Sequence, residues 1–357
     1  MNKPRIALIL GATGGAGGEI AAALRRRGWQ VRALVRDPAR PRPSTDMLSA
    51  DIEWRTGDAM NAADVAQAAR GVDVIVHAVN PPGYRDWHKL VLPMLDNTIA
   101  AARAVGARIV LPGTVYNFAP DALPLLHEDS PQQPRTRKGA IRVELERRLQ
   151  QASADGVRSL ILRCGDFFGP HAGNNWFAAM VKPGRPARSI VYPGERALRH
   201  AWAYLPDVGE TVARLLERED ELAVFERFHF GGHWVDGNAM TDTIRRAVDN
   251  PKLPVRAFPW WLATLASPFV TLFRELREMR YLWQQPLQLD NRKLAAFLGS
   301  EPHTGLDRAV EATLRGRRCI DRETSALGAI LQERTNARCS WRRDGKSIAT
   351  EVAPTKD

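Results

Sequence analysis

The 357-residue sequence has no run of 18 uninterrupted apolar residues, the length at which a membrane-spanning helix is expected. Its N-terminus lacks a charged segment followed by an apolar run and a cleavage site. The apolar run at residues 5–10 is therefore predicted to be a first strand rather than a signal peptide. Cysteine is scarce, since Cys164, Cys319 and Cys339 lie far apart and form neither a metal-binding pair nor an even disulfide set. These absences favour a protein of the reducing cytoplasm with no metal site.

Several motifs that carry known chemistry are also missing. The chain contains no G-x-S-x-G, no H-E-x-x-H and no Walker-type lysine, so hydrolase and kinase chemistry are disfavoured. The net charge of +11 could indicate nucleic acid, but the arginines form no basic stripe with interleaved aromatic residues. We therefore expect a small-molecule substrate and no nucleic-acid partner, with an anionic cofactor that accounts for part of the positive charge.

What the sequence does contain is an alternation of strand and helix patterns. The segments predicted to be strands are residues 5–10, 30–36, 51–60, 73–79, 107–113 and 158–164. Helical patterns lie between most of them, around 61–70, 86–105 and 137–155. Strands that alternate with helices form right-handed βαβ units. We therefore predict an α/β fold built on a Rossmann-type, doubly wound parallel sheet.

The remaining patterns predict how the chain is divided. We expect a dinucleotide-binding domain over residues 1–165, to which 201–227 return. A smaller, mostly helical substrate-binding part is expected over 166–200 and 228–316. The last segment, 317–357, is polar, arginine-rich and aperiodic, which predicts a weakly ordered tail.

A glycine-rich segment, "GATGGAGG", lies between the first strand and the helix after it. Gly11, Gly14 and Gly17 have the spacing in which the first glycine permits a tight turn, the second lets a pyrophosphate approach the backbone, and the third allows close packing. The helix that follows would offer its N–H groups to the phosphates. We predict a dinucleotide site here, lined also by Thr13 and Gly15.

The end of the second strand indicates which nucleotide binds. An acid in this place accepts from the ribose 2′-hydroxyl of NAD, whereas an arginine suits the 2′-phosphate of NADP. The strand ends on Arg36, with Arg40 nearby, and a guanidinium can hold phosphate through two hydrogen bonds. Asp37 is the alternative, because a shift of one residue would put an acid there. We favour NADP(H) over NAD(H).

Together these motifs resemble the short-chain dehydrogenase/reductase superfamily in its extended and atypical branches, and are similar to its NAD-dependent epimerase/dehydratase and NmrA-like groups. The resemblance spans about residues 4–315. The matching segments are "GATGGAGG", "GDAMN", "HAVNPP", "LPGTVYNF", "LILRCGDFFGP" and "WAYLPDVGE". The resemblance implies that Asp58 and Ala59 lie at the adenine and that Ala78 and Val79 line the cofactor.

The catalytic residues usual in this superfamily are changed in this chain. Its members carry Tyr-x-x-x-Lys about twenty residues after the strand-five tyrosine, which is Tyr116 here. The matching positions hold Lys138 and Arg142, and none of the five tyrosines has a lysine four residues later. The serine or threonine usual before the Val-Tyr pair is Pro112, with Thr114 two residues on. The candidate catalytic residues are therefore Lys138, Tyr116, Thr114 and Arg142.

Two interpretations of the altered pair stay open. Lys138 and Arg142 share one helix face at i,i+4 spacing. Arg142 would then bind the cofactor ribose. A neighbouring cation in a desolvated site lowers the pKa of a lysine, which would let Lys138 act as general acid. The alternative is an exposed helix with an ion pair between Glu144 and Arg148 and no chemistry.

These residues predict an oxidoreductase that transfers a hydride between NADP(H) and a small, largely apolar carbonyl or alcohol. One alternative is a non-catalytic, redox-sensing NADP(H)-binding regulator of the NmrA-like type. A further alternative is a nucleotide-sugar-type epimerase or dehydratase, which the missing tyrosine disfavours because that chemistry needs a working base.

One apolar run belongs to the expected substrate-binding part. "FPWWLATLASPFVTLF", residues 258–273, is too short to span a bilayer and is interrupted by Pro268. Its three interpretations are packed core helices, a lid over an apolar pocket and a segment that contacts a membrane interface.

Overall fold

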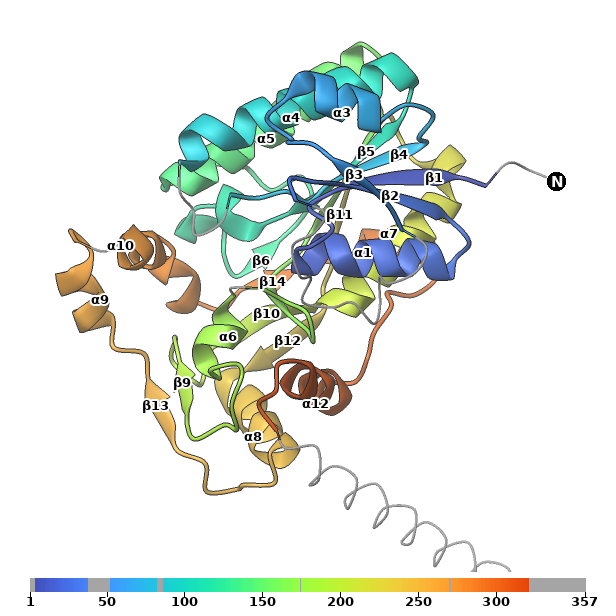
Figure 1. Ribbon diagram of the computed structural model, residues 1–357. Helices are drawn as coiled ribbons and strands as arrows, with labels where there is room; N and C mark the ends of the chain where they lie inside the picture. The colour runs from blue at the N-terminus through green and yellow to red at the C-terminus, as the bar shows by residue number, and fades with distance from the viewer. Residues whose placement is uncertain (1–3, 38–51, 82–85, 174, 270, 321–357) are drawn as a thin grey trace, which may run out of the picture.

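The centre of the protein is a seven-stranded parallel sheet (Figure 1). The computed structural model describes residues 4–37, 52–81, 86–173, 175–269 and 271–320. In sheet order the strands are β11 (Phe225–His229), β7 (Ser159–Arg163), β5 (Arg108–Gly113), β4 (Val74–His77), β1 (Ile6–Leu10), β2 (Gln30–Val35) and β3 (Ile52–Thr56). The direction of winding reverses between β1 and β4, which confirms the doubly wound Rossmann-type sheet. Arg40, Cys339 and most of the expected tail lie outside the described residues.

Helices cover both faces of this sheet (Figure 1). One face carries α3 (Ala62–Ala68), α4 (Trp87–Val105) and α5 (Arg137–Ala154), and the other carries α1 (Gly15–Arg26) and α7 (Leu205–Glu217). Alternate residues of β1 point to opposite faces: Leu8 packs in the core with α4, and Ile9 packs in the core with α1 and α7. Both faces are therefore dry, which explains why the central strands are continuous apolar runs.

The sheet has one strand more than the six that periodicity predicted. β11 pairs only with β7 and forms the edge of the sheet. Its sequence, "FERFH", mixes apolar and polar residues, and its first three residues are only half-buried. The strand crosses the predicted boundary between the dinucleotide-binding domain and the substrate-binding part, at residues 227 and 228. The division of the chain into these two parts stays a proposal.

The rest of the chain forms a smaller, second layer below α1 and α7 in Figure 1. Its helices are α6 (Trp176–Met180), α8 (Gly237–Ala247), α9 (Trp260–Ala266), α10 (Thr271–Glu278) and α12 (Leu306–Gly316). The helix α11 (Arg292–Leu298) instead packs on β11 of the main sheet, and its Leu294 belongs to the same core as Ile9. The short strands of the second layer are β6 (Leu125–Leu126), β8 (Asp166–Phe168), β9 (Ile190–Tyr192), β10 (Arg199–Tyr204), β12 (His233–Asp236), β13 (Val255–Ala257) and β14 (Gln288–Leu289). Short 3₁₀ turns include η2 (Val115–Asn117) and η5 (Arg280–Trp283). A second apolar core, rich in aromatic side chains, holds this part together.

Within the described residues, no helix has the length and apolar character needed to cross a bilayer.

Candidate active site

In the glycine loop after β1, close backbone contacts within the protein require glycine at two positions. Gly11 has a φ of +94°, and a Cβ on it would lie 2.6 Å from the carbonyl oxygen of Ala78. A Cβ on Gly17 would collide with the carbonyl oxygen of Gly11. These two positions let β1, β4 and α1 approach one another closely, so packing alone accounts for both glycines.

Gly14 differs because the protein leaves room around it. It is exposed, its φ is −89°, and a Cβ on it would lie 3.3 Å from the nearest described atom, the carbonyl oxygen of Gly11. It caps α1, whose first turn has no side-chain cap and no acidic residue, and Thr13 beside it is also exposed. Uncapped N–H groups at a helix start attract phosphate. These residues fit the pyrophosphate of a dinucleotide.

The other predicted cofactor residues follow the ends of neighbouring strands. Arg36 and Asp37 are both exposed just beyond β2, and Ala78 and Val79 are half-buried just beyond β4. Because all these strands are parallel, their carboxyl ends meet at the edge of the sheet where the glycine loop lies.

Beyond β3, the loop that the resemblance assigns to adenine is held by hydrogen bonds. The backbone N–H of Asp58 donates to Asp64 over 2.9 Å, and the amide of Asn97 donates to the carbonyl of buried Ala59 over 2.9 Å. The loop is thus fixed to the first turns of α3 and to α4.

Gly15 connects the loop to the smaller part of the protein. A Cβ on Gly15 would lie 2.9 Å from the side chain of Leu205 and 3.0 Å from Cα of Ala172. The first turn of α1 therefore packs against the segment after β8 and the start of α7.

The start of α5 packs against η2, the turn that carries Tyr116. Gly139 lies so close to the carbonyl oxygen of Tyr116 that a side chain there would collide with it. Thr136 caps the helix by accepting from the N–H of Gly139 over 3.0 Å. Thr114 caps η2 in the same way, accepting from the N–H of Tyr116 over 3.4 Å. Thus Lys138, Tyr116 and Thr114 lie in adjoining turns.

Lys138 is buried, with 3% of its surface exposed. Its backbone N–H donates to Glu278 over 3.3 Å, so the end of α10 contacts the first turn of α5. Burial of a lysine is rare unless its charge has a specific environment, which separates this residue from a solvated helix face.

Arg142, one turn later on α5, lies toward the cofactor edge. Its guanidinium carbon is 5.2 Å from the centre of the Trp87 ring at the start of α4. Burial, followed by the nearby charge of Arg142, lowers the pKa of His77 to about 3. His77 is the last residue of β4 and directly precedes Ala78. Arg142 thus reaches from α5 to the strand end that the resemblance assigns to the cofactor.

A buried polar network behind η2 was not predicted from the sequence. Arg163, at the end of β7, donates to the carboxylate of Glu146 over 2.7 Å and to the carbonyl of Thr114 over 2.6 Å. Asn117 donates to the other oxygen of Glu146 over 2.9 Å. Since Thr114 and Asn117 flank Tyr116, this network fixes the turn that carries it.

His229 completes the network as a neutral imidazole. Burial, followed by the charge of Arg163, lowers its pKa to about 3. Its Nδ1 lies 3.1 Å from the carbonyl of Leu126, which can only accept, so Nδ1 carries the proton. Its Nε2 then accepts from Nε of Arg163 over 3.2 Å.

The exposed-helix interpretation of α5 therefore holds for its outer face alone. Glu144 and Arg148 form the predicted i,i+4 ion pair at 2.8 Å. Glu146, two residues after Glu144, is 5% exposed and belongs to the buried network. The one sequence signal for that network was Arg163, which stands inside a segment of the family resemblance.

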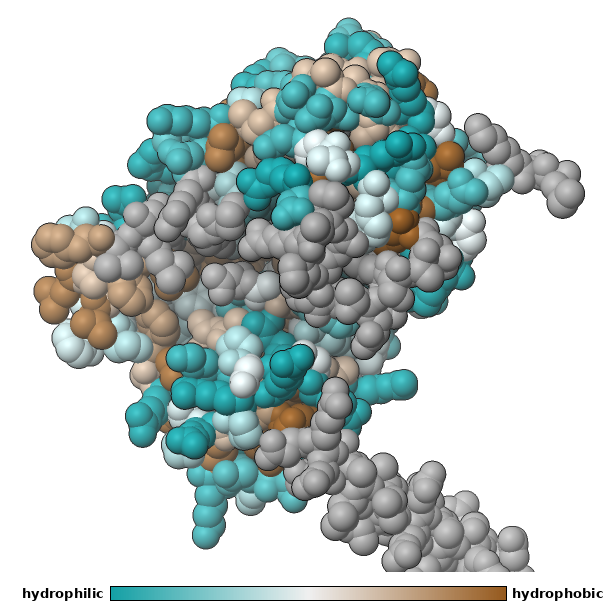
Figure 2. Space-filling view, viewed as in Figure 1, coloured by the Kyte–Doolittle hydropathy of each residue, from teal (hydrophilic) through white to brown (hydrophobic). Residues whose placement is uncertain are grey.

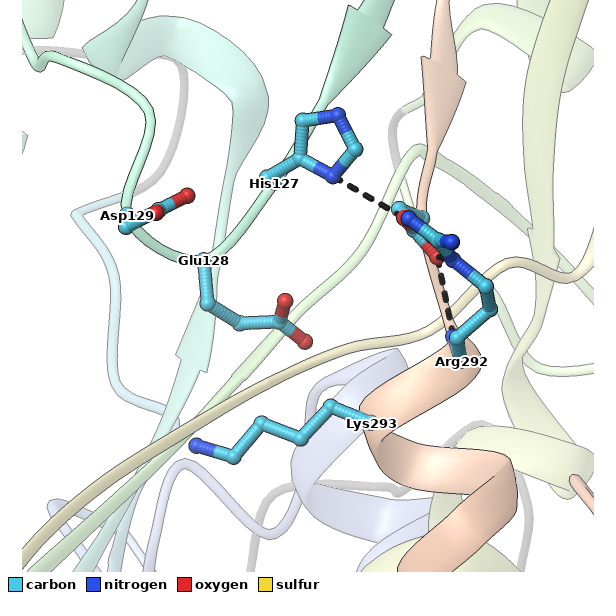
Figure 3. A pocket seen from close by; sticks show the side chains of 6 residues that line it. His127, Glu128, Asp129, Arg292 and Lys293 are labelled. Atoms are coloured by element: carbon cyan, nitrogen blue, oxygen red, sulfur yellow. Dashed lines mark hydrogen bonds and ion pairs between the residues drawn. The ribbon is translucent and has the colours of Figure 1, made fainter.

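A polar hollow lies apart from this site (Figure 3). It has a volume of ≈350 Å³ and lies beside the ends of β6 and β14. His127, Glu128, Asp129, Asp290, Arg292 and Lys293 line it. Glu128 accepts from the backbone N–H of His229 at the end of the edge strand β11, so β7, β5 and β4 separate the hollow from the glycine loop. Among the described side chains, no group of three or more His, Cys, Asp or Glu could hold a metal ion.

Fold and glycine loop together define a Rossmann-type dinucleotide-binding protein. More narrowly, the chain belongs to the NAD dependent epimerase/dehydratase family, whose sequence profile matches residues 7–231. Membership supports a pyridine nucleotide as cofactor and a small molecule as substrate, and it confirms the predicted superfamily.

Two curated relatives match parts of the chain. A 3-diazoavenalumate denitrifying reductase from Streptomyces is 32% identical over 180 residues, which cover 46% of this chain and 57% of the relative. An uncharacterised protein of Sinorhizobium fredii is 26% identical over 207 residues, covering 52% of this chain and 57% of the relative. The chain thus spans 57% of the length of each.

Solved structures share the fold over most of the chain. An epimerase-like protein from Burkholderia cenocepacia has a TM-score of 0.69 at 18% identity, covering 89% of this chain and 99% of that one. L-threonine dehydrogenase from Clostridium difficile has a TM-score of 0.69 at 16% identity, covering 90% and 100%. WbmH from Bordetella bronchiseptica, solved in complex with NAD⁺, has a TM-score of 0.64 at 18% identity, covering 88% and 99%. At such identities the likeness concerns the fold alone.

Proposed function

We propose that this protein is an oxidoreductase that transfers a hydride between NADP(H) and a small, largely apolar carbonyl or alcohol. One observation carries the proposal: α5 places Lys138 beside the turn of Tyr116 and directs Arg142 to the end of β4. A cation toward the cofactor and a group able to move a proton toward the substrate are the two functions that such a reaction needs. The reductase relative from Streptomyces adds support.

The reaction in the reducing direction has a simple balance. NADPH, when bound, supplies the hydride for the carbonyl carbon. The carbonyl oxygen then takes a proton from a side chain of this site, which leaves an alcohol and NADP⁺. We assign that proton to Lys138, with Tyr116 and Thr114 as the hydroxyl donors in reach of the same turn. Arg142 binds the ribose.

The preference for NADP(H) over NAD(H) rests on Arg36. Its side chain is exposed at the end of β2, beside the glycine loop, where a guanidinium can hold a 2′-phosphate through two hydrogen bonds. The free thiols of Cys164 and Cys319 support a further proposal, a reducing cytoplasmic compartment.

The test begins with a screen for NADPH oxidation by apolar aldehydes and ketones. With a substrate in hand, Lys138→Met should lower kcat about 10²–10⁴-fold and leave NADPH affinity nearly unchanged. Arg142→Met should instead weaken NADPH binding. The exposed Lys252→Met is the matched control and should behave as wild type.

Other outcomes would redirect the proposal. Full turnover in Lys138→Met would exclude Lys138 as the proton donor and make Tyr116→Phe the next variant. NADPH binding without turnover of any carbonyl would favour the redox-sensing regulator. Conversion of a nucleotide sugar with no net change in NADPH would favour an epimerase or dehydratase.

A further inference from the structure

A row of large apolar side chains on α9 and the turn after it faces solvent. Trp261 is 68% exposed, Leu265 66% and Phe269 88%, and Leu262 beside them is 45% exposed. Trp261 and Leu265 are four residues apart and therefore lie on one side of α9, and Phe269 follows in the turn. Figure 2 shows hydrophobic surface gathered at the edge of the molecule where α9 and α10 lie. We call these four residues the apolar tip.

The base of the same segment is held firmly. The ring of Trp260 packs tilted against the rings of Trp176 and Phe258, and its indole N–H donates to the carbonyl of Pro193 over 2.6 Å. The hydroxyl of Tyr281, just after α10, donates to the carbonyl of Phe118 over 2.9 Å. Ala263 is buried, so the opposite side of α9 faces the interior of the protein. The exposure of the tip is therefore a consequence of how α9 is oriented.

The segment that carries the tip has an excess of positive charge. Between residues 256 and 280 the chain has four arginines and two glutamates. Arg256 and Arg277 are exposed and form no ion pair with any described residue. Arg280 lies with its guanidinium carbon 5.4 Å from the ring of Trp260. One of the two glutamates, Glu278, is turned inward to the backbone of Lys138.

We propose that the apolar tip docks on an anionic membrane surface. Tryptophan, leucine and phenylalanine side chains of a short helix can enter the boundary between headgroups and acyl chains, while arginines bind the lipid phosphates. The net charge of +11 adds a long-range attraction to such a surface. A second copy of this chain is the poorer occupant, because a two-fold contact places the same arginine-rich rim against itself.

The proposal is tested with the full chain and sucrose-loaded vesicles, without nucleotide, so its outcome does not depend on the proposed reaction. Wild-type protein should sediment with phosphatidylcholine vesicles that contain phosphatidylglycerol, and less with phosphatidylcholine alone or at high salt. The double variant Trp261→Ser/Leu265→Ser should bind at least roughly tenfold more weakly. Val224→Ser, which alters a 46% exposed residue elsewhere, should bind as wild type.

The charges have their own variant. Arg256→Gln/Arg277→Gln should lose about tenfold or more in binding to the anionic vesicles and little on phosphatidylcholine. Circular dichroism checks that each variant is folded. The proposal would be overturned if the wild-type protein did not bind anionic vesicles, or if Trp261→Ser/Leu265→Ser bound them as tightly as wild type. A mass in solution that halves in this variant, without vesicle binding, would assign the tip to a second copy instead.

Discussion

At the scale of single residues, the glycines of the loop differ in what surrounds them. Gly17 is enclosed by the backbone of Gly11, whereas Gly14 is exposed and has ordinary backbone angles. We expect Gly14→Val to fold and to lose binding of NADPH and NADH alike, because the side chain blocks the approach of the pyrophosphate. We expect Gly17→Val to unfold or expand the protein. Thermal unfolding and nucleotide titration of both variants check this, and normal binding by a folded Gly14→Val would move the site elsewhere.

The proposed preference for NADP(H) predicts a specific effect of removing Arg36. Removing a charge-assisted contact to the 2′-phosphate should cost about 1.5–3 kcal/mol, or roughly ten- to a hundredfold in NADPH affinity. Arg36→Ala should leave NADH affinity almost unchanged, since NADH has no 2′-phosphate. Exposed Arg70→Ala serves as the control for charge alone. Equal affinities of wild-type protein for both nucleotides would contradict the preference.

At the scale of elements, α5, β7 and η2 are joined by the pair of Glu146 and Arg163, both at least 95% buried. Glu146→Ala leaves the guanidinium buried without its counter-ion and should cost about 3–5 kcal/mol of unfolding free energy. Urea denaturation measures this loss. A double change, Glu146→Met/Arg163→Met, should cost less than the two single changes added together, because neither charge is then left alone. A loss below about 1 kcal/mol in Glu146→Ala would mean that the pair is open to water.

The helices and strands that could be predicted are those that the local pattern of apolar and polar residues is enough to identify. β1 is apolar throughout because both of its faces are covered, and the helices α4 and α5 begin and end within two residues of the predicted bounds. The glycine loop was predictable because its spacing and flanking elements are local. The partners of Glu146 were not, since Arg163 and Asn117 lie 17 and 29 residues away, and its neighbours on the chain suggested a solvated face. Edge strand β11 was missed because its half-exposed pattern resembles a loop.

At the scale of the whole molecule, the surroundings of three buried histidines favour the neutral imidazole in the folded protein. Burial is the main cause that lowers the pKa of His77 and His229 to about 3 and that of His233 to about 4. The charges of Arg142 and Arg163 add to the effect for the first two. An unfolded histidine has a pKa of about 6.5. Between the pKa of the folded state and that of the unfolded state, the unfolded chain binds more protons than the folded protein. Stability must therefore fall as the pH falls.

The pH range in which stability falls should identify the histidines as its cause. Above about pH 6.5 the three histidines are neutral in both states and contribute no slope. Below that pH, each should lower the unfolding free energy by up to about 1.4 kcal/mol per pH unit. The effect ends at the pKa of the folded state, which is about 4 for His233 and about 3 for His77 and His229. The carboxylates of Glu144 and Asp290, whose pKa is lowered to about 2 by arginine partners, add their loss only below about pH 4.5. A decline of the unfolding free energy between pH 6.5 and 5, measured by urea denaturation, would therefore come from the histidines.

The variant His229→Gln keeps a donor and an acceptor but cannot be protonated in this range, so it should reduce the slope by about a third. Exposed His88→Gln is the control, and an unchanged slope in His229→Gln would show that this imidazole is reached by water in the folded protein.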